Sequence, residues 1–386
     1  MDDRDVRMKS QWVYGLLLAG LSVSPLSMAG PPSYSVQELG ANQYVLAINN
    51  RDQVLTWEGN DSAPSYLYEK SGAAINLNAL PRLSAECRYG PAAGPLVVAA
   101  AGLNNRGVVL LNVLGPQANP DPGPDCIVLY HDGVLTRRTL GPNAYAVSIN
   151  DRDELIGNRS TPDNQYVGIG PRCHFEQPDS VLTAQAINDR GQIVGVSANG
   201  WNGSELCTDG VWQAIPGFPG GLAPPLAPMF ASAINNKGEV VGTESVAVGP
   251  SNTAPHGFLY SNGQTVDLGV LAPPTPGQAP DDSVYPESIN VNSQIVGAAY
   301  TAAGPTVFLY QDSQIYDVIT LISVDDPLHG QVQLLGGSQI NDAGVIAANG
   351  LDLRTGTVHV YVLTPLADTA CDSAQPCGNT GAASLR

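Results

Sequence analysis

Apolar and polar residues alternate in short runs along most of the chain, and turn sequences rich in asparagine and glycine separate these runs. This pattern predicts β-strands joined in hairpins. One copy reads as strand 231–234, turn Asn235-Asn236-Lys237-Gly238, return strand 239–245, strand 257–261, turn Asn262-Gly263 and strand 265–269. The predicted unit is therefore a four-stranded antiparallel sheet.

The first hairpin of this unit repeats. The sequence AINDRGQIVG at 186–195 returns as SINDRDELIG at 148–157, AINNKGEVVG at 233–242 and SINVNSQIVG at 288–297. An asparagine after the apolar residue marks seven copies: Asn49, Asn104, Asn150, Asn188, Asn235, Asn290 and Asn341. Their spacings of 55, 46, 38, 47, 55 and 51 residues are close to the period of a propeller blade, roughly 40–50 residues. We predict an all-β fold, a seven-bladed β-propeller of four-stranded antiparallel blades.

The turn sequence explains why the motif recurs. Asn-Asx-x-Gly suits a type I turn that ends in a left-handed residue, with the side chain of the first asparagine bonded to the backbone. The seven marker asparagines are therefore predicted to be structural residues that reverse the chain in each blade. Ligand binding by these asparagines is the alternative.

The two ends of the repeat array complement each other. After His359–Leu363 in the seventh copy, no strand follows that resembles TVDLG at 265–269, whereas YSVQELG at 34–40 precedes the first marker as an extra strand. We predict that this N-terminal strand joins the last blade and closes the ring, which removes an open sheet edge. The prediction gives one propeller domain at residues 30–366 and a flexible C-terminal tail at 367–386.

Residues 1–29 have the pattern of a secretory signal peptide. Arg7 and Lys9 precede an apolar run from Trp12 to Val23, and Ser27-Met28-Ala29 suits a signal peptidase. The acidic start MDDRD is unusual for such a signal, so Met8 is an alternative start. A retained membrane anchor is another alternative, but the run is shorter than the ~20 residues that span a bilayer. We expect export, with no membrane insertion after cleavage.

The composition and charge of the chain narrow the classes of molecule that it could bind. The net charge of -18 disfavours nucleic acid as a partner, because both molecules are negative. The 43% of hydrophobic residues, together with 42 glycines and 31 prolines, favours a globular chain with many turns. The six cysteines follow the signal, and an even number in an exported chain predicts disulfides. They are Cys87, Cys126, Cys173, Cys207, Cys371 and Cys377. Their connectivity stays open, and Cys371 with Cys377 is the favoured pair because these two are close in sequence.

The turn motif, an aromatic strand and a TVDLG-like strand in an exported chain together resemble the bacterial extracellular HAF-repeat proteins, over about residues 34–366. The family's His-Ala-Phe triplet is matched most nearly by His256-Gly257-Phe258. Copies two (GLNNRGVVLL) and seven (QINDAGVIAA) depart further from the signature. The resemblance implies export and repetition, and it carries over no catalytic residue.

Long loops within and between blades belong to the face opposite the tight turns, so we expect a ligand there and at the mouth of the central channel. Aromatic and arginine residues are the usual anchors of such surfaces, although for each one alone a solvated loop residue is the stronger interpretation. The candidate binding residues are Arg82, Arg88, Tyr89, Tyr166, Arg172, His174, Trp201, Asp281, Asp282, Tyr285 and His329.

The sequence contains no nucleophile elbow, zinc-binding helix motif, P-loop or dinucleotide motif. No cofactor or metal is expected, and no catalytic residue is assigned. The sequence therefore predicts a secreted, monomeric binding module for an extracellular carbohydrate or protein. The alternative is a polysaccharide hydrolase or lyase whose carboxylates and histidine come from different blades.

Overall fold

β-Strands form most of the regular structure in the computed structural model, which describes residues 31–59, 64–88, 96–114, 126–141, 144–160, 166–169, 171–173, 182–197, 203–222, 229–247, 253–271 and 283–367. These residues all belong to one unit, Pro31–Arg386. Predictions for the signal peptide (1–29), for the tail beyond residue 367, and for Tyr89, His174, Trp201, Asp281 and Asp282 fall outside the described residues.

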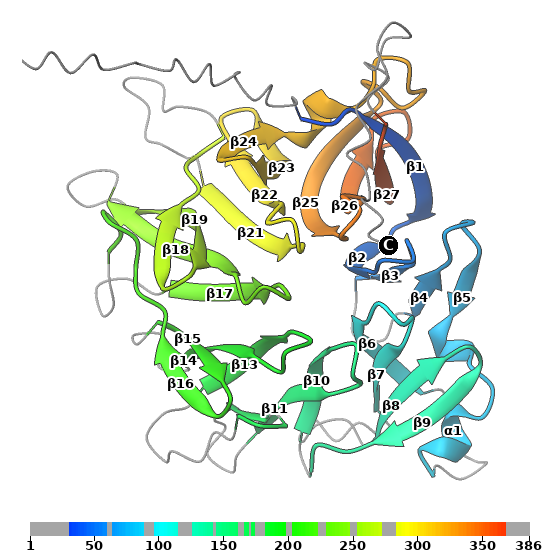
Figure 1. Cartoon of the computed structure of the whole chain (residues 1–386). Helices are drawn as coiled ribbons and strands as arrows, with labels where there is room; N and C mark the ends of the chain where they lie inside the picture. The colour runs from blue at the N-terminus through cyan, green and yellow to red at the C-terminus, as the bar shows by residue number, and fades with distance from the viewer. Residues whose placement is uncertain are drawn as a thin grey trace, which may run out of the picture. The chain divides into compact units, whose positions relative to one another are not determined.

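The described strands form six four-stranded sheets and one three-stranded sheet, all with antiparallel ladders (Figure 1). In spatial order the strands are β2 (Tyr44–Ile48), β3 (Val54–Trp57), β4 (Ser65–Tyr68) and β5 (Ala74–Asn76); β6 (Val97–Leu103), β7 (Val109–Leu114), β8 (Cys126–His131) and β9 (Val134–Arg138); β10 (Ala144–Ile149), β11 (Leu155–Ser160) and β12 (Tyr166–Ile169); β13 (Leu182–Ile187), β14 (Ile193–Ser197), β15 (Ser204–Thr208) and β16 (Val211–Ala214); β17 (Met229–Ile234), β18 (Val240–Ala247), β19 (Thr253–Ser261) and β20 (Gln264–Asp267); β21 (Ser283–Ile289), β22 (Ile295–Thr301), β23 (Gly304–Gln311) and β24 (Gln314–Asp317); and β1 (Tyr34–Ala41), β27 (Thr357–Pro365), β26 (Ile346–Asp352) and β25 (Val332–Ile340). Three short helical segments, η1 (Leu77–Ala79), α1 (Leu83–Glu86) and η2 (Val318–Leu321), lie in the connections.

The predicted all-β propeller with four-stranded antiparallel blades is confirmed, but its blade count is corrected. Six blades have four strands, not seven, because the sheet β10–β11–β12 has three strands within the described residues. The sequence after β12, GPRCHFEQPDS, contains two prolines and no Asn-Gly or Asp-Gly turn. Proline cannot donate a ladder hydrogen bond, so this stretch lacks the signals of a second hairpin.

The strand that precedes each marker asparagine carries a register shift at the same place, for example between Val45 and Ala47 in β2 and between Ala231 and Ala233 in β17. Such a bulge leaves backbone groups without a partner in their own ladder. The residue left out of the register is three before the marker, such as Leu46 or Ser232, and the backbone N–H of the residue before it bonds to the preceding sheet. Asn349, Ser65, Asn112, Asn158, Ser204 and Glu287 accept hydrogen bonds from the backbone N–H groups of Val45, Ala100, Ala146, Ala184, Ala231 and Gly337.

The remaining junction follows a different route. Its residue at this position is Pro286, which has no N–H to satisfy, and its carbonyl accepts a 2.6 Å hydrogen bond from Ser232 of the preceding sheet. The bulges therefore join neighbouring sheets as well as bending individual strands.

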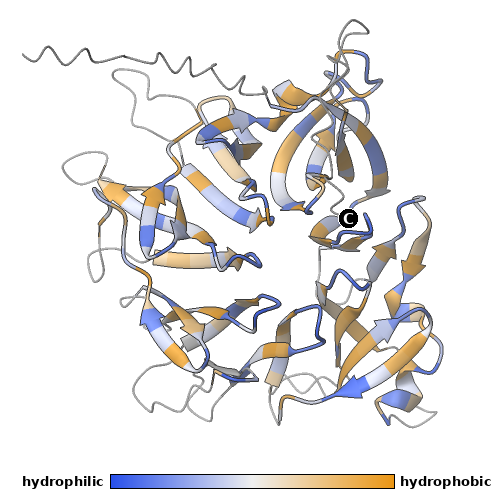
Figure 2. Ribbon diagram, in the orientation of Figure 1, coloured by the Kyte–Doolittle hydropathy of each residue, from blue (hydrophilic) through white to orange (hydrophobic). Residues whose placement is uncertain are grey.

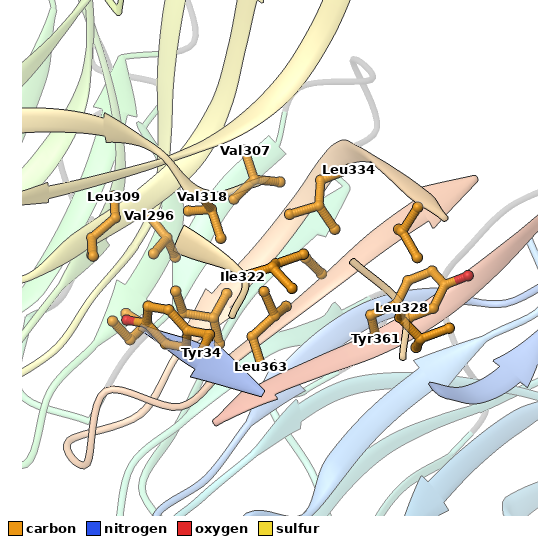
Figure 3. Close-up of a cluster of buried hydrophobic side chains, with 14 residues drawn as sticks. Tyr34, Val296, Val307, Leu309, Val318, Ile322, Leu328, Leu334, Tyr361 and Leu363 are labelled. Atoms are coloured by element: carbon orange, nitrogen blue, oxygen red, sulfur yellow. The ribbon is translucent and has the colours of Figure 1, made fainter. Parts of the chain in front are cut away.

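Strand β1 pairs antiparallel with β27, from Tyr34 opposite Pro365 to Ala41 opposite His359. This is the pairing predicted for residues 34–40. Tyr34 is fully buried in a cluster with Val296, Val318, Ile322 and Leu363 (Figure 3). Because Val296 comes from β22 and Leu363 from β27, the N-terminal strand packs against side chains from two sheets.

Two disulfides connect sequence neighbours among the cysteines: Cys87 with Cys126 and Cys173 with Cys207. The favoured pair, Cys371 with Cys377, falls outside the described residues. Two disulfides are typical of a protein that folds in an oxidising compartment. In the described part of the chain, no helix has the length and hydropathy needed to cross a membrane.

Candidate functional site

Each marker asparagine closes its own turn. In the fourth copy, Asn188 Oδ1 accepts hydrogen bonds from the backbone N–H groups of Arg190 and Gln192, each at 3.0 Å. The corresponding pair of bonds is present in the other six copies. The fourth residue of every turn has a positive φ: Asp52, Gly107, Asp153, Gly191, Gly238, Ser293 and Gly344. The turns therefore have the left-handed end that the sequence motif suits.

The same asparagines also join neighbouring sheets. Each Nδ2 donates to the main-chain oxygen of the next marker, in the order Asn49 to Asn104, Asn150, Asn188, Asn235, Asn290 and Asn341, over 2.9–3.1 Å. The seventh bond runs from Asn341 to Asn49 over 3.0 Å. Sequence reasoning assigned these residues to their own turns and missed the contact between sheets.

The second amide hydrogen of each marker is also used. In five copies it goes to the Gln or Glu four residues later: Gln53, Glu154, Gln192, Glu239 and Gln294. In the other two copies that residue is a valine, and the bond goes to an aspartate in the next turn: Asn104 to Asp153 and Asn341 to Asp52. The marker side chains are buried with all their amide groups bonded, so they are structural residues with no group left for a ligand.

A pocket of about 170 Å³ lies among the seven turns. The residue after each marker contributes a side chain to its lining: Asn50, Asn105, Asp151, Asp189, Asn236, Val291 and Asp342. The residue before each marker lines it as well: Ile48, Leu103, Ile149, Ile187, Ile234, Ile289 and Ile340. The turns that point toward the centre of the arrangement are hydrophilic (Figure 2).

A second set of hydrogen bonds fixes the pocket lining. The backbone N–H of Asn50 donates to Asn105 Oδ1, and the pattern continues through Asp151 and Asp189 to Asn236, over 2.6–2.9 Å. It resumes from Val291 to Asp342 and from Asp342 to Asn50, at 3.0 and 2.9 Å. Val291 has no side-chain acceptor, so the set is interrupted between Asn236 and Val291.

The pocket is acidic. Its lining contains three carboxylates, those of Asp151, Asp189 and Asp342, and no basic side chain. Burial raises the pKa of Asp151; N–H groups of Asn105 oppose this rise, and the nearby Asp189 carboxylate adds to it. An acidic pocket of this kind favours cationic or neutral hydrogen-bonding groups over anions.

The candidate loop residues that the structure describes lie on separate elements. Arg82 and Arg88 flank α1, Tyr166 lies on β12, Tyr285 on β21, and His329 in the connection between η2 and β25. Arg172 lies beside the tight-turn residues Gly191 and Gly210, so it belongs with the tight turns rather than with the opposite face. The pocket residues were missed, although an Asn or Asp follows six of the seven markers and marks them in the sequence.

Within the described residues, no group of three or more His, Cys, Asp or Glu side chains is placed to hold a metal ion. No protein-family model and no curated protein sequence matches the chain.

Solved structures give several matches. The chain is similar to a structure of YCF48 bound to D1 peptide, with a TM-score of 0.47 and 9% identity, covering 88% of this chain and 97% of that one. It is similar to AofleA from Arthrobotrys oligospora (TM-score 0.34, 12% identity, 85% of each chain). It is also similar to the SapL1 lectin in complex with alpha methyl fucoside (TM-score 0.31, 12% identity, 71% of this chain and 94% of that one). At these identities and TM-scores, the likeness supports no conclusion about what this chain binds.

Proposed function

We propose that this chain is an exported, non-catalytic β-propeller that binds an extracellular or cell-surface carbohydrate or protein at its central channel. The observation that carries the proposal is the pocket to which all seven turns contribute, with its lining fixed by hydrogen bonds between neighbouring turns. A lining held in place before binding loses little conformational entropy on association. The two disulfides and the pattern of residues 1–29 support export.

In this proposal the seven sheets form one closed ring, with the sheet β10–β11–β12 as the blade that the six four-stranded sheets leave out. Three contacts support closure. Asn341 donates to the main-chain oxygen of Asn49, Asp342 exchanges hydrogen bonds with Asn50, and β1 pairs with β27. A ring that joins its first and last blades leaves no free sheet edge at the junction.

One observation favours a second candidate, a polysaccharide hydrolase. Asp151 has a raised pKa and lies next to Asp189 in the same pocket. Glycoside hydrolysis uses two neighbouring carboxyl groups, one of which keeps its proton to act as the acid.

A binding screen with product analysis separates the two. The mature protein is tested on glycan arrays, in pull-downs from extracellular extracts, and in assays for products released from polysaccharides. Binding without products supports the proposal. Product release that Asp151→Asn abolishes would establish the hydrolase instead.

A second pair of variants tests the pocket itself. Val291 lines the pocket without making a side-chain hydrogen bond, so Val291→Trp fills the space and keeps the bonded turns. We expect Val291→Trp to abolish binding and Val291→Ala to preserve it. Equal binding by the two variants would place the ligand elsewhere.

A further inference from the structure

Aromatic residues recur at one register position on the strands that precede the marker turns. Five residues before each marker stand Tyr44, Ala99, Tyr145, Thr183, Phe230, Tyr285 and Gly336. Each of them pairs with the residue eight after its own marker, as Tyr44 does with Trp57 and Phe230 with Thr243, so the positions are structurally equivalent. Four of the seven are aromatic.

Three of these four aromatic side chains are exposed. Tyr44 is 40% exposed, Phe230 46% and Tyr285 36%, and Tyr300, which packs edge-on against Tyr285, is 48% exposed. In the described part of the chain, these four are the aromatic members of the exposed large hydrophobic side chains. Tyr44 also packs against Trp57, with 6.2 Å between ring centroids. We refer to Tyr44, Tyr145, Phe230, Tyr285 and Tyr300 as the aromatic layer.

The aromatic layer and the pocket lie at opposite ends of the same strands. Strands β2, β10, β17 and β21 each run from an aromatic residue near their start to the marker turn that follows their end. These strands lie on the inner side of their sheets, where the turns converge (Figure 1). These inner strands therefore have polar, acidic turns at one end and aromatic residues at the other.

The row of residues next to the aromatic ones has little free charge, even though the whole chain carries -18. Two residues nearer each marker, the same strands present Leu46, Ala101, Val147, Gln185, Ser232, Glu287 and Ser338. The one charged side chain in this row, Glu287, accepts hydrogen bonds from the backbone N–H and the hydroxyl of Ser338, at 2.5 and 2.9 Å. Gln185 is an exposed amide in the same row. This described row offers a basic peptide no available carboxylate, and an anionic polymer would be repelled by the chain as a whole.

We propose that the aromatic layer binds a neutral glycan, with sugar rings stacked on Tyr44, Phe230 and Tyr285. A pyranose ring presents a face of C–H groups that suits the negative face of an aromatic ring, while its hydroxyl groups need neutral donors and acceptors at the rim. This inference rests on the proposed binding function: it specifies the class of ligand and gives the glycan a second contact, beyond the pocket, along the same inner strands.

The test is isothermal titration calorimetry of the mature protein with soluble fragments of neutral β-glucan, mannan and chitin. An alginate fragment is the anionic comparison. We expect a neutral fragment to bind and alginate not to bind. Tyr44→Ala, Phe230→Ala and Tyr285→Ala should each weaken binding by about tenfold, and Tyr44→Phe should retain it because the ring remains. Tyr316→Ala, on the outer strand β24, is the matched control and should leave binding unchanged. Thermal melts verify that each variant is folded.

The outcomes separate this inference from the proposed function. Neutral-glycan binding that Val291→Trp abolishes and the three aromatic variants leave intact would overturn the aromatic site and keep the binding function. Capture of a protein ligand that depends on the aromatic layer, with no glycan bound, would overturn the glycan assignment alone. Binding of no glycan and no protein by the folded chain would overturn both.

Discussion

At the scale of single residues, the pocket lining contains one natural interruption. The backbone N–H of Asn236 faces a turn in which Val291 offers no oxygen, whereas the other six turns donate to an Asn or Asp at the corresponding place. We predict that Val291→Asn completes the set and raises the free energy of unfolding by about 0.5–1.5 kcal/mol, the value of one hydrogen bond. Urea unfolding gives the measurement. Val291→Ala is the control, and an equal stability of the two variants would contradict the prediction.

Glu244 provides a pH-dependent test. It is 1% exposed, its Oε2 accepts a bond from the N–H of Phe218, and its Oε1 is buried without a partner. Burial raises its pKa, the Phe218 N–H opposes the rise, and Asp267 adds to it. A carboxyl whose pKa is higher in the folded than in the unfolded state contributes stability below its ordinary pKa and loses that contribution as pH rises.

We therefore predict that the native protein loses stability relative to Glu244→Gln between about pH 4.5 and pH 7.5, because the amide cannot ionise. Urea midpoints at the two pH values measure this difference. Asp312→Asn, in an exposed turn, is the control for replacing a surface carboxylate by an amide. Parallel stability profiles for the native protein and Glu244→Gln would show that burial of this carboxyl has no such cost.

Among single residues, the contacts within a turn could be predicted from the sequence, and the contacts between turns could not. The turn motif predicted the bonds within each turn because those bonds depend on local spacing. The link from Asn341 to Asp52 could not be predicted, because it joins residues 289 positions apart and depends on Val345 standing where other copies have Gln or Glu. The exchange of valine for a polar residue is visible in the sequence, but its meaning requires knowing that the two turns are neighbours.

At the scale of elements, one fully buried side chain, Tyr34, anchors strand β1. Tyr34 is fully buried, and its hydroxyl has no hydrogen-bond partner. Tyr34→Ala should lower the free energy of unfolding by about 3–5 kcal/mol through the cavity it leaves. Tyr34→Phe should leave stability equal or raise it by up to about 1 kcal/mol, because it removes an unpaired buried hydroxyl. Chemical unfolding of both variants tests this account, and a large loss in Tyr34→Phe would mean that the hydroxyl is bonded in solution.

Most elements could be predicted because hairpin turns and alternation are local signals. Strand β1 was placed correctly because the last copy lacked a closing strand and the N-terminus held one in excess. The predicted fourth strand of the third sheet is not found among the described residues. It was predicted because the period of the repeat was extended over GPRCHFEQPDS, which has no hairpin signal of its own. The bulges were not predicted, since the polar residues that complete them, such as Asn112 and Asn158, belong to the preceding sheet.

At the scale of the whole molecule, the proposed site exists only if the first and last sheets meet. The pocket takes Asn50 from the first turn and Asp342 from the last, and the bond from Asn341 to Asn49 crosses the same junction. In an open array the terminal units have one neighbour each and fray before the interior ones. In a closed ring every sheet has two neighbours, so the first and last sheets are as stable as the interior ones.

Native-state hydrogen exchange followed by mass spectrometry tests this closure most directly, by comparing the turn amides of residues 49–53 and 341–345 with those of residues 188–192. The account predicts equal protection of the three turns, with exchange governed by unfolding of the whole ring. Markedly faster exchange at residues 49–53 and 341–345 would show an open array and contradict both the closed ring and the pocket built on it.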